Sequence, residues 1–105
     1  MRVEFSLGAR GDLIAIFDYL RPRNPRAARR IVSELEKRCR SLSRSPKRGA
    51  PVISRRGVPL RRLVVGQYLI FYEVTDEKVF INAVVHGARD YEPLVELRIS
   101  AGKDD

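Results

Sequence analysis

A histidine, an arginine and an aspartate follow the last apolar run of this chain. Residues 80–85 are mostly apolar and β-branched, and His86, Arg89 and Asp90 come directly after them. Polar groups at the end of a rigid strand are well placed for binding or catalysis. An imidazole can transfer protons near neutral pH, and a guanidinium can bind phosphate or carboxylate groups. This segment is the first candidate for a functional site.

Cleavage of RNA by its own 2′-hydroxyl is one reaction such groups could support. That reaction needs a proton acceptor, a proton donor and cations to stabilise the charged phosphorane. If the chain is a ribonuclease, the candidate catalytic residues are Arg62, Glu73, His86 and Arg89. The alternatives are structural: His86 hydrogen-bonds the turn, and Arg89 forms an ion pair with Asp90.

Other catalytic patterns are missing from the sequence. It contains no glycine-rich phosphate loop, no cluster of metal-ligand residues and no nucleophile triad. Its single cysteine, Cys39, excludes an internal disulfide and lies on an apolar helical stripe, so we expect it in the core. We therefore expect no metal and no cofactor.

The spacing of apolar residues predicts which elements hold these side chains. Ser6 and Asn24–Pro25 are helix-opening signals, and Gly66–Gln67 fits a two-residue hairpin turn. The predicted elements are a strand over 2–5, two amphipathic helices ending before Ser45–Pro46, a loop over 46–59 and strands over 60–65, 68–74 and 79–85. This order predicts an α+β fold in which an antiparallel two-helix hairpin packs on a three- to four-stranded antiparallel sheet. Residues 92–100 fit either a short helix or an extra strand.

The predicted turns at Gly66–Gln67 and Thr75–Lys78 fix a register for the sheet. Across the first turn, Val65 faces Tyr68 and Arg61 faces Tyr72. Across the second, Tyr72 faces Ile81, Ile70 faces Ala83 and Tyr68 faces Val85. One face of this sheet should pack under the helices. The opposite face should be exposed, because little chain remains to cover it. An exposed apolar patch with a polar rim indicates a partner surface.

Composition and charge limit the class of protein. The chain has 105 residues, 44% hydrophobic and 32% charged, which predicts one domain over residues 1–100 and a flexible tail over 101–105. No apolar run is long enough to span a membrane and no signal peptide is visible, so we expect a cytoplasmic protein without a membrane partner. The net charge is +8, yet residues 21–62 hold 15 Lys and Arg against two Glu. That imbalance indicates an acidic partner, either nucleic acid or an acidic protein segment, although a solvated helix face is the simpler explanation.

Six motifs in order resemble one known family. They include Asn24-Pro25-Arg-Ala-Ala28, the segment from Gly66-Gln67-Tyr68 to Tyr72, and His86-Gly87-Ala88-Arg89-Asp90. Over roughly residues 3–92 the chain resembles the RelE/ParE superfamily of toxins from bacterial type II toxin–antitoxin systems, on the ParE side. The resemblance implies a hetero-oligomer with a cognate ParD-like antitoxin whose acidic, amphipathic C-terminal segment wraps the toxin. Operator DNA would be bound only through the antitoxin.

The resemblance also implies a target and a set of contact residues. ParE-like members trap DNA gyrase on cleaved DNA, which would make His86, Arg89 and Tyr91 target contacts. The antitoxin would bind the predicted open sheet face, through Arg62, Leu69, Phe71, Phe80, Asn82 and Val84.

Two alternatives stay open. RelE-like members cut mRNA on the ribosome, but the inner strands here hold no lysine, and apolar residues fill much of the face where cations would be expected. The third possibility is a protein without toxicity that acts only as a corepressor with its antitoxin.

Overall fold

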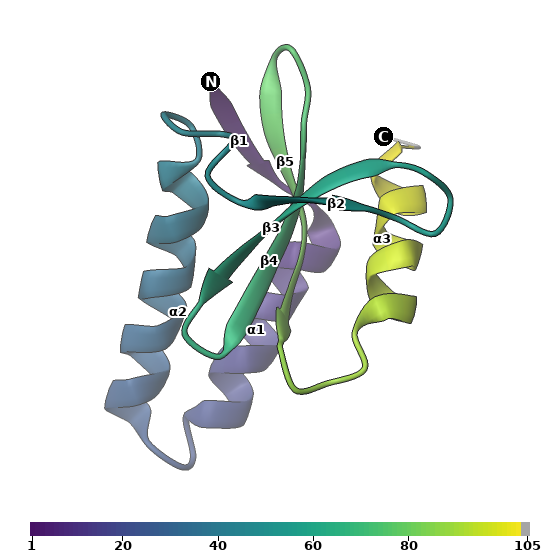
Figure 1. The fold of residues 1–105 in the computed structure, drawn as a ribbon. Coiled ribbons are helices and arrows are strands. Elements are labelled where there is room, and N and C mark those ends of the chain that lie inside the picture. The colour runs from purple at the N-terminus through teal and green to yellow at the C-terminus, as the bar shows by residue number, and fades with distance from the viewer. Residues whose placement is uncertain (104–105) are drawn as a thin grey trace.

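The computed structural model describes residues 1–103 and confirms the α+β fold. The elements in chain order are β1 (Arg2–Phe5), α1 (Leu7–Leu20), α2 (Pro25–Ser41), β2 (Ala50–Ile53), β3 (Pro59–Val65), β4 (Tyr68–Val74), β5 (Lys78–His86) and α3 (Glu92–Lys103). The strands form a five-stranded sheet in the order β1-β5-β4-β3-β2. α2 and α3 lie on opposite sides of this sheet in Figure 1.

The sheet is larger than predicted. β1 joins it as an edge strand parallel to β5, while the other neighbours are antiparallel. β2 lies inside the predicted loop over 46–59 and pairs with β3. The loop before it is fixed by Tyr72, whose buried hydroxyl accepts a hydrogen bond from the Gly49 amide and donates one to the Pro46 carbonyl, both at 2.8 Å. Burial raises the pKa of the Tyr72 hydroxyl, so that it remains a donor.

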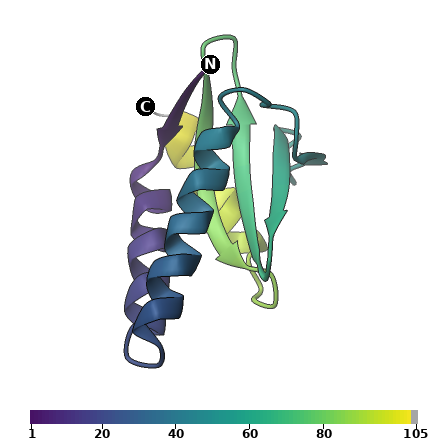
Figure 2. The ribbon, with the colours of Figure 1, turned by 90° about the vertical axis from the view of Figure 1, so that its left-hand side faces the viewer.

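The two helices of the hairpin begin where the capping residues predict. Ser6 Oγ accepts from the Ala9 amide at 2.9 Å, and Asn24 Oδ1 accepts from the Ala27 amide at 3.1 Å. Pro25 occupies the first turn of α2, where its missing N–H costs nothing. Figure 2 shows the two helices side by side along one face of the sheet.

The predicted pairing of β3 with β4 is confirmed. Val65 faces Tyr68 and Arg61 faces Tyr72 across the two-residue turn. Gly66 has a φ of +59°, in the left-handed region that glycine adopts without a steric cost.

The pairing of β4 with β5 departs from the prediction at a β-bulge. Tyr72 faces Ile81 as predicted, but Phe71 faces Ala83, so Asn82 is an extra residue on β5. The pairs that follow are Ile70–Val84 and Tyr68–His86, in place of the predicted Ile70–Ala83 and Tyr68–Val85. Because side chains alternate along a strand, the bulge exchanges the two faces for the second half of β5.

The sheet therefore has a hydrophobic core on each face. The core under the helical hairpin contains Phe5, Ala9, Leu35, Cys39, Leu42, Leu63, Val65, Ile70, Tyr72, Val79, Ile81 and Val84. The core under α3 contains Leu60, Phe71, Ala83, Val85, Val95 and Ile99. Cys39 is fully buried, as predicted, and burial raises the pKa of its thiol to about 12.

The prediction of an open sheet face is wrong. α3 covers this face. The helix extends to Lys103, so it includes residues 101–103 of the predicted flexible tail. Residues 104–105 of that tail lie outside the described part. The residues assigned to antitoxin binding are consequently enclosed to different degrees. Phe71, Phe80, Asn82 and Val84 are buried, with Val84 facing the hairpin, while Arg62 and Leu69 are half-buried.

Replacing Phe71 by alanine tests whether α3 covers this face. Phe71 is 3% exposed and its ring lies 5.4 Å from that of Tyr91. We expect Phe71→Ala to lower the free energy of unfolding by about 3–5 kcal/mol, as for other buried phenylalanines. Val64, also on the sheet but 57% exposed, is the control, and Val64→Ala should change stability by no more than about 0.5 kcal/mol. Equal effects of the two substitutions in urea denaturation would contradict this placement of α3.

Candidate functional site

A groove of about 620 Å³ lies between α1, the end of β5 and the beginning of α3. Its walls are Asp12, Ala15, Ile16, Tyr19, Tyr68, Val84, Val85, His86, Arg89 and Leu94. The lining is mainly apolar, with an imidazole, a guanidinium and two phenols among it. A concave apolar surface with a few polar groups is the usual form of a binding site. Burial raises the pKa of Tyr68, which keeps its hydroxyl neutral.

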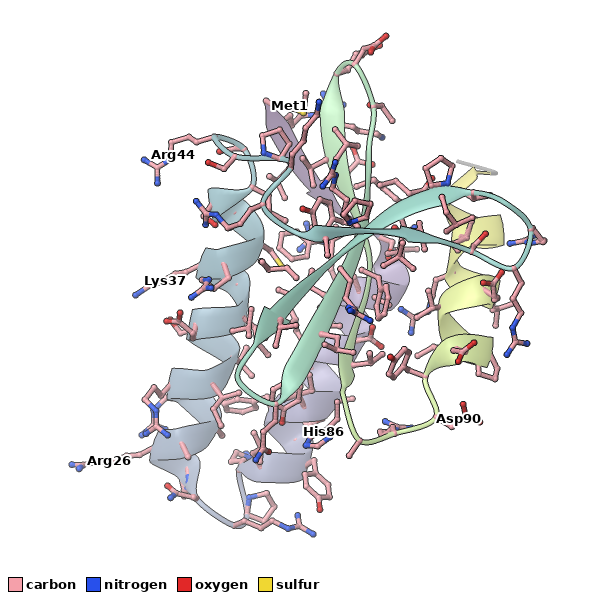
Figure 3. All side chains as sticks on the ribbon, viewed as in Figure 1. Met1, Arg26, Lys37, Arg44, His86 and Asp90 are labelled. Carbon is pink, nitrogen blue, oxygen red and sulfur yellow. The ribbon has the colours of Figure 1, made fainter. Side chains whose placement is uncertain are left out.

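His86 is held by the turn that it begins. The Ala88 amide donates to His86 Nδ1 at 3.1 Å, and His86 Nε2 lies 3.2 Å from Gln67 Oε1. Since Nδ1 accepts, Nε2 carries the proton and donates to the glutamine. The ring also stands edge-on to Tyr68, with centroids 5.3 Å apart. These contacts fix the imidazole in the wall of the groove. Figure 3 shows the labelled His86 at the end of β5.

The three predicted target contacts do not form one cluster. His86 and Arg89 line the groove, and the Arg89 side chain is exposed. Tyr91 instead packs on Phe71 and lines a smaller hollow, of about 200 Å³, between α3 and β2. No ion pair joins Arg89 to Asp90 within the described chain, contrary to the structural alternative.

The four residues considered for RNA cleavage do not form one cluster either, because His86 and Arg89 line the groove while Arg62 and Glu73 lie elsewhere, on β3 and β4. His86 faces Tyr68, and Glu73 lies five positions further along β4. At about 3.3 Å per residue, roughly 16 Å separates the two candidate acid–base groups, too far for both to act on one phosphate. The Glu73 carboxylate accepts a hydrogen bond from Asn82 Nδ2 at 2.8 Å, and Arg62 lies in the smaller hollow with Tyr91.

Asp12, in the wall of the groove, belongs to an ion pair that the sequence did not predict. Arg98 on α3 makes two parallel hydrogen bonds to the Asp12 carboxylate on α1, at 2.8 and 2.9 Å. Asp12 also accepts from the Val84 amide at 2.9 Å, and Arg98 donates to the Asn82 carbonyl at 3.1 Å. A Cβ on Gly8 would lie 2.5 Å from the guanidinium, so glycine leaves room for Arg98 there.

Two kinds of site were not found among the described residues. No group of three or more His, Cys, Asp or Glu side chains among them is arranged to hold a metal ion. None of their helices is both long and apolar enough to cross a membrane.

Comparisons with known proteins agree on the class. The structure of a chromosomal ParDE toxin–antitoxin system from P. aeruginosa matches with a TM-score of 0.68 at 21% identity, over 82% of this chain and 95% of that chain. The toxin–antitoxin complex RelBE2 from Mycobacterium tuberculosis matches with a TM-score of 0.62 at 28% identity, over 81% of this chain and 95% of that chain. The fold is thus that of the RelE/ParE superfamily, as the sequence motifs predicted.

Sequence comparison identifies the family. The family model described as the ParE toxin of type II toxin–antitoxin systems matches residues 3–91. Toxin RelE2 of Caulobacter vibrioides is 37% identical over 89 residues, which are 84% of this chain and 97% of that protein. The chain belongs to the ParE toxin family of type II toxin–antitoxin systems.

Replacing Asp12 by asparagine tests the role of the ion pair. The side chains of Arg98 and Asp12 are only 17% and 13% exposed, so the change leaves a charge largely desolvated without its partner. We expect a loss of about 2–4 kcal/mol in unfolding free energy, near the range for buried pairs. Amides of α3 should also exchange with solvent faster. Asp18→Asn, at an exposed position of the same helix, is the control; unchanged protection of α3 in Asp12→Asn would contradict this role.

Proposed function

We propose that this toxin inhibits DNA gyrase by trapping it on cleaved DNA, in the cytoplasm, and that a ParD-like antitoxin neutralises it. The match of residues 3–91 to the ParE toxin model is the observation that carries this proposal. The site geometry supports it, since the candidate acid–base groups His86 and Glu73 are separated along β4. A gyrase inhibitor needs contact groups rather than a proton donor and acceptor around one phosphate.

The groove and the outer side of α1 form the proposed antitoxin-binding surface. Large apolar side chains are exposed on the two helices that flank the groove: on α1, Leu7 is 88% exposed and Ile14 and Tyr19 are 62% exposed each, and on α3, Leu97 is 66% exposed. α1 therefore carries apolar residues on its outer side as well as on its buried side. An amphipathic segment that folds on binding would cover this apolar surface, and acidic residues in it would match Arg89.

This arrangement gives a direct mechanism of neutralisation. His86 and Arg89, the proposed target contacts, lie in the same groove. An antitoxin segment bound there would cover both side chains, so that antitoxin and target compete for one surface. The toxin and its antitoxin would then form an inactive hetero-oligomer.

Cleavage of ribosome-bound mRNA is the second candidate. The 37% identity to a protein named toxin RelE2 favours it. A ribosome-dependent nuclease could use Arg62, Glu73, His86 or Arg89 singly, with the remaining groups supplied by the ribosome.

Parallel assays distinguish these functions. We expect purified protein to make gyrase accumulate cleaved, linear DNA and to leave mRNA on translating ribosomes intact. Arg89→Ala should reduce the cleaved product at least about tenfold, because a charged contact at a target interface is worth about 1.5–3 kcal/mol or more. Arg55→Ala, at another exposed arginine outside the groove, is the control.

Other results of these assays have clear meanings. Cut mRNA with unaffected gyrase would replace the first candidate by the second. Inactivity in both assays, together with tight antitoxin binding, would favour the non-toxic corepressor.

A separate substitution tests the antitoxin surface. We expect Leu97→Asp to weaken binding of the antitoxin encoded beside the toxin at least about tenfold, because a carboxylate would be desolvated in the interface. Ile53→Asp is a matched control, since Ile53 is also 66% exposed but lies on β2. The measurement is calorimetric titration, with circular dichroism to check folding. If Leu97→Asp leaves the affinity unchanged and Leu69→Asp weakens binding, the antitoxin binds the sheet face beneath α3 and not the proposed surface.

A further inference from the structure

The outer face of α2 carries a stripe of positive charge that the groove does not use. Arg26, Arg30 and Lys37 of α2, together with Arg44 just beyond the helix end at Ser41, define this basic stripe, and all four side chains are exposed. Arg26, Arg30 and Lys37 recur at helical spacing opposite the buried residues Ala28, Leu35 and Cys39. In Figure 3 the labelled Arg26, Lys37 and Arg44 point away from the body of the protein.

Local ion pairs do not neutralise the stripe. The two acidic residues of α2, Glu34 and Glu36, pair with Arg38 and Arg40 at 3.5 and 3.1 Å. Both pairs lie beside the stripe, so its own charges are left for a partner. The stripe thus differs from an ordinary charged helix face, in which basic and acidic side chains of the same face pair with each other.

The chemistry of the face identifies the kind of partner. No large apolar side chain is exposed on α2, whereas Leu7, Ile14 and Tyr19 are exposed on α1 and Leu97 is exposed on α3. A folding protein segment would need such apolar anchors, but a phosphate backbone needs only positive charge. α2 also has no aromatic residue, and unpaired bases are usually bound by aromatic stacking.

We propose that the basic stripe of α2 binds the phosphodiester backbone of a nucleic-acid duplex, independently of sequence. At about 1.5 Å per residue the stripe runs roughly 16 Å from Arg26 to Lys37, a straight row that can follow several consecutive phosphates. The stripe is separate from the groove, so this binding does not depend on which target the toxin has.

Binding of the full chain to a fluorescent 20-base-pair DNA of arbitrary sequence tests the proposal. Arg26, Arg30 and Lys37 are changed together to alanine, the residue with the highest helix propensity, so α2 should remain folded. The control changes Arg2, Arg55 and Arg56 to alanine, which gives the same net charge but leaves α2 intact. The ion pairs of Arg2 with Glu4 and of Arg55 with Glu92 are exposed and contribute little stability. Arg56 pairs with Glu96, which is 21% exposed, so circular dichroism is used to check that the control variant is folded.

The two variants should behave differently. We expect the stripe variant to lose at least about tenfold in affinity for the duplex, and its log–log salt dependence to become less steep by about 2–3 units, close to one unit per lost phosphate contact. The control should stay within about threefold of the parent protein. A duplex RNA of the same sequence distinguishes DNA from RNA as the source of the backbone.

Three results would overturn the proposal. Equal losses in the two variants would mean that net charge, not the stripe, determines binding. Equal affinity of the parent protein for duplex and single strand would mean that no regular backbone is recognised. A stripe variant that loses affinity for poly-glutamate but keeps its affinity for duplexes would assign the face to an acidic protein.

Discussion

The rest of the structure depends on the β-bulge at Asn82 and on the Asp12–Arg98 ion pair, which hydrogen-bonds to the backbone at the bulge. An extra residue on β5 removes backbone groups from the sheet ladder, and each buried group left unsatisfied costs about 1–3 kcal/mol. Asp12 accepts from the Val84 amide, while Ser6 and Arg98 donate to the Asn82 carbonyl. Because Asp12 and Arg98 also bind each other, the bulge, α1 and α3 are held together by one set of polar contacts.

The bulge also explains why the protein has two cores and a groove. Beyond it, Val84 faces the helical hairpin, and Ala83 and Val85 face α3. α3 must therefore cover the second face of the sheet, and its attachment beside α1 leaves the groove between the two helices. Large apolar side chains remain exposed on α1 and α3 and at Ile53, Val64 and Val74 of the sheet, whereas Phe71, Phe80 and Val84, which were predicted to be open, are buried. Leu97 is 66% exposed, whereas Phe71 is 3% exposed.

The sequence predicted the features that depend on residues close together in the chain. Ser6 and Asn24 cap the helices because their oxygens accept from amides three residues ahead, and Gly66 permits a two-residue turn. The bulge could not be predicted in this way, since the polar partner of Val84 is 72 residues away. The same limit applies to α3. Its apolar side can be recognised only when the sheet face that it covers is known. The position of His86 and Arg89 at a strand end made them candidates from the sequence, but Asp12 and the other residues that line the groove could be recognised only from the fold.

The separation of charge from apolar surface has a consequence for regulation. Leu7, Ile14 and Tyr19 are exposed on α1 and Leu97 is exposed on α3, the two helices that flank the groove, whereas the basic stripe lies on the outer face of α2. An antitoxin segment in the groove would exclude the target, because both would need His86 and Arg89. It would leave Arg26, Arg30 and Lys37 exposed. On the proposals made above, neutralised toxin would keep its affinity for a duplex backbone, and the toxin–antitoxin complex would bind operator DNA more tightly than the antitoxin alone.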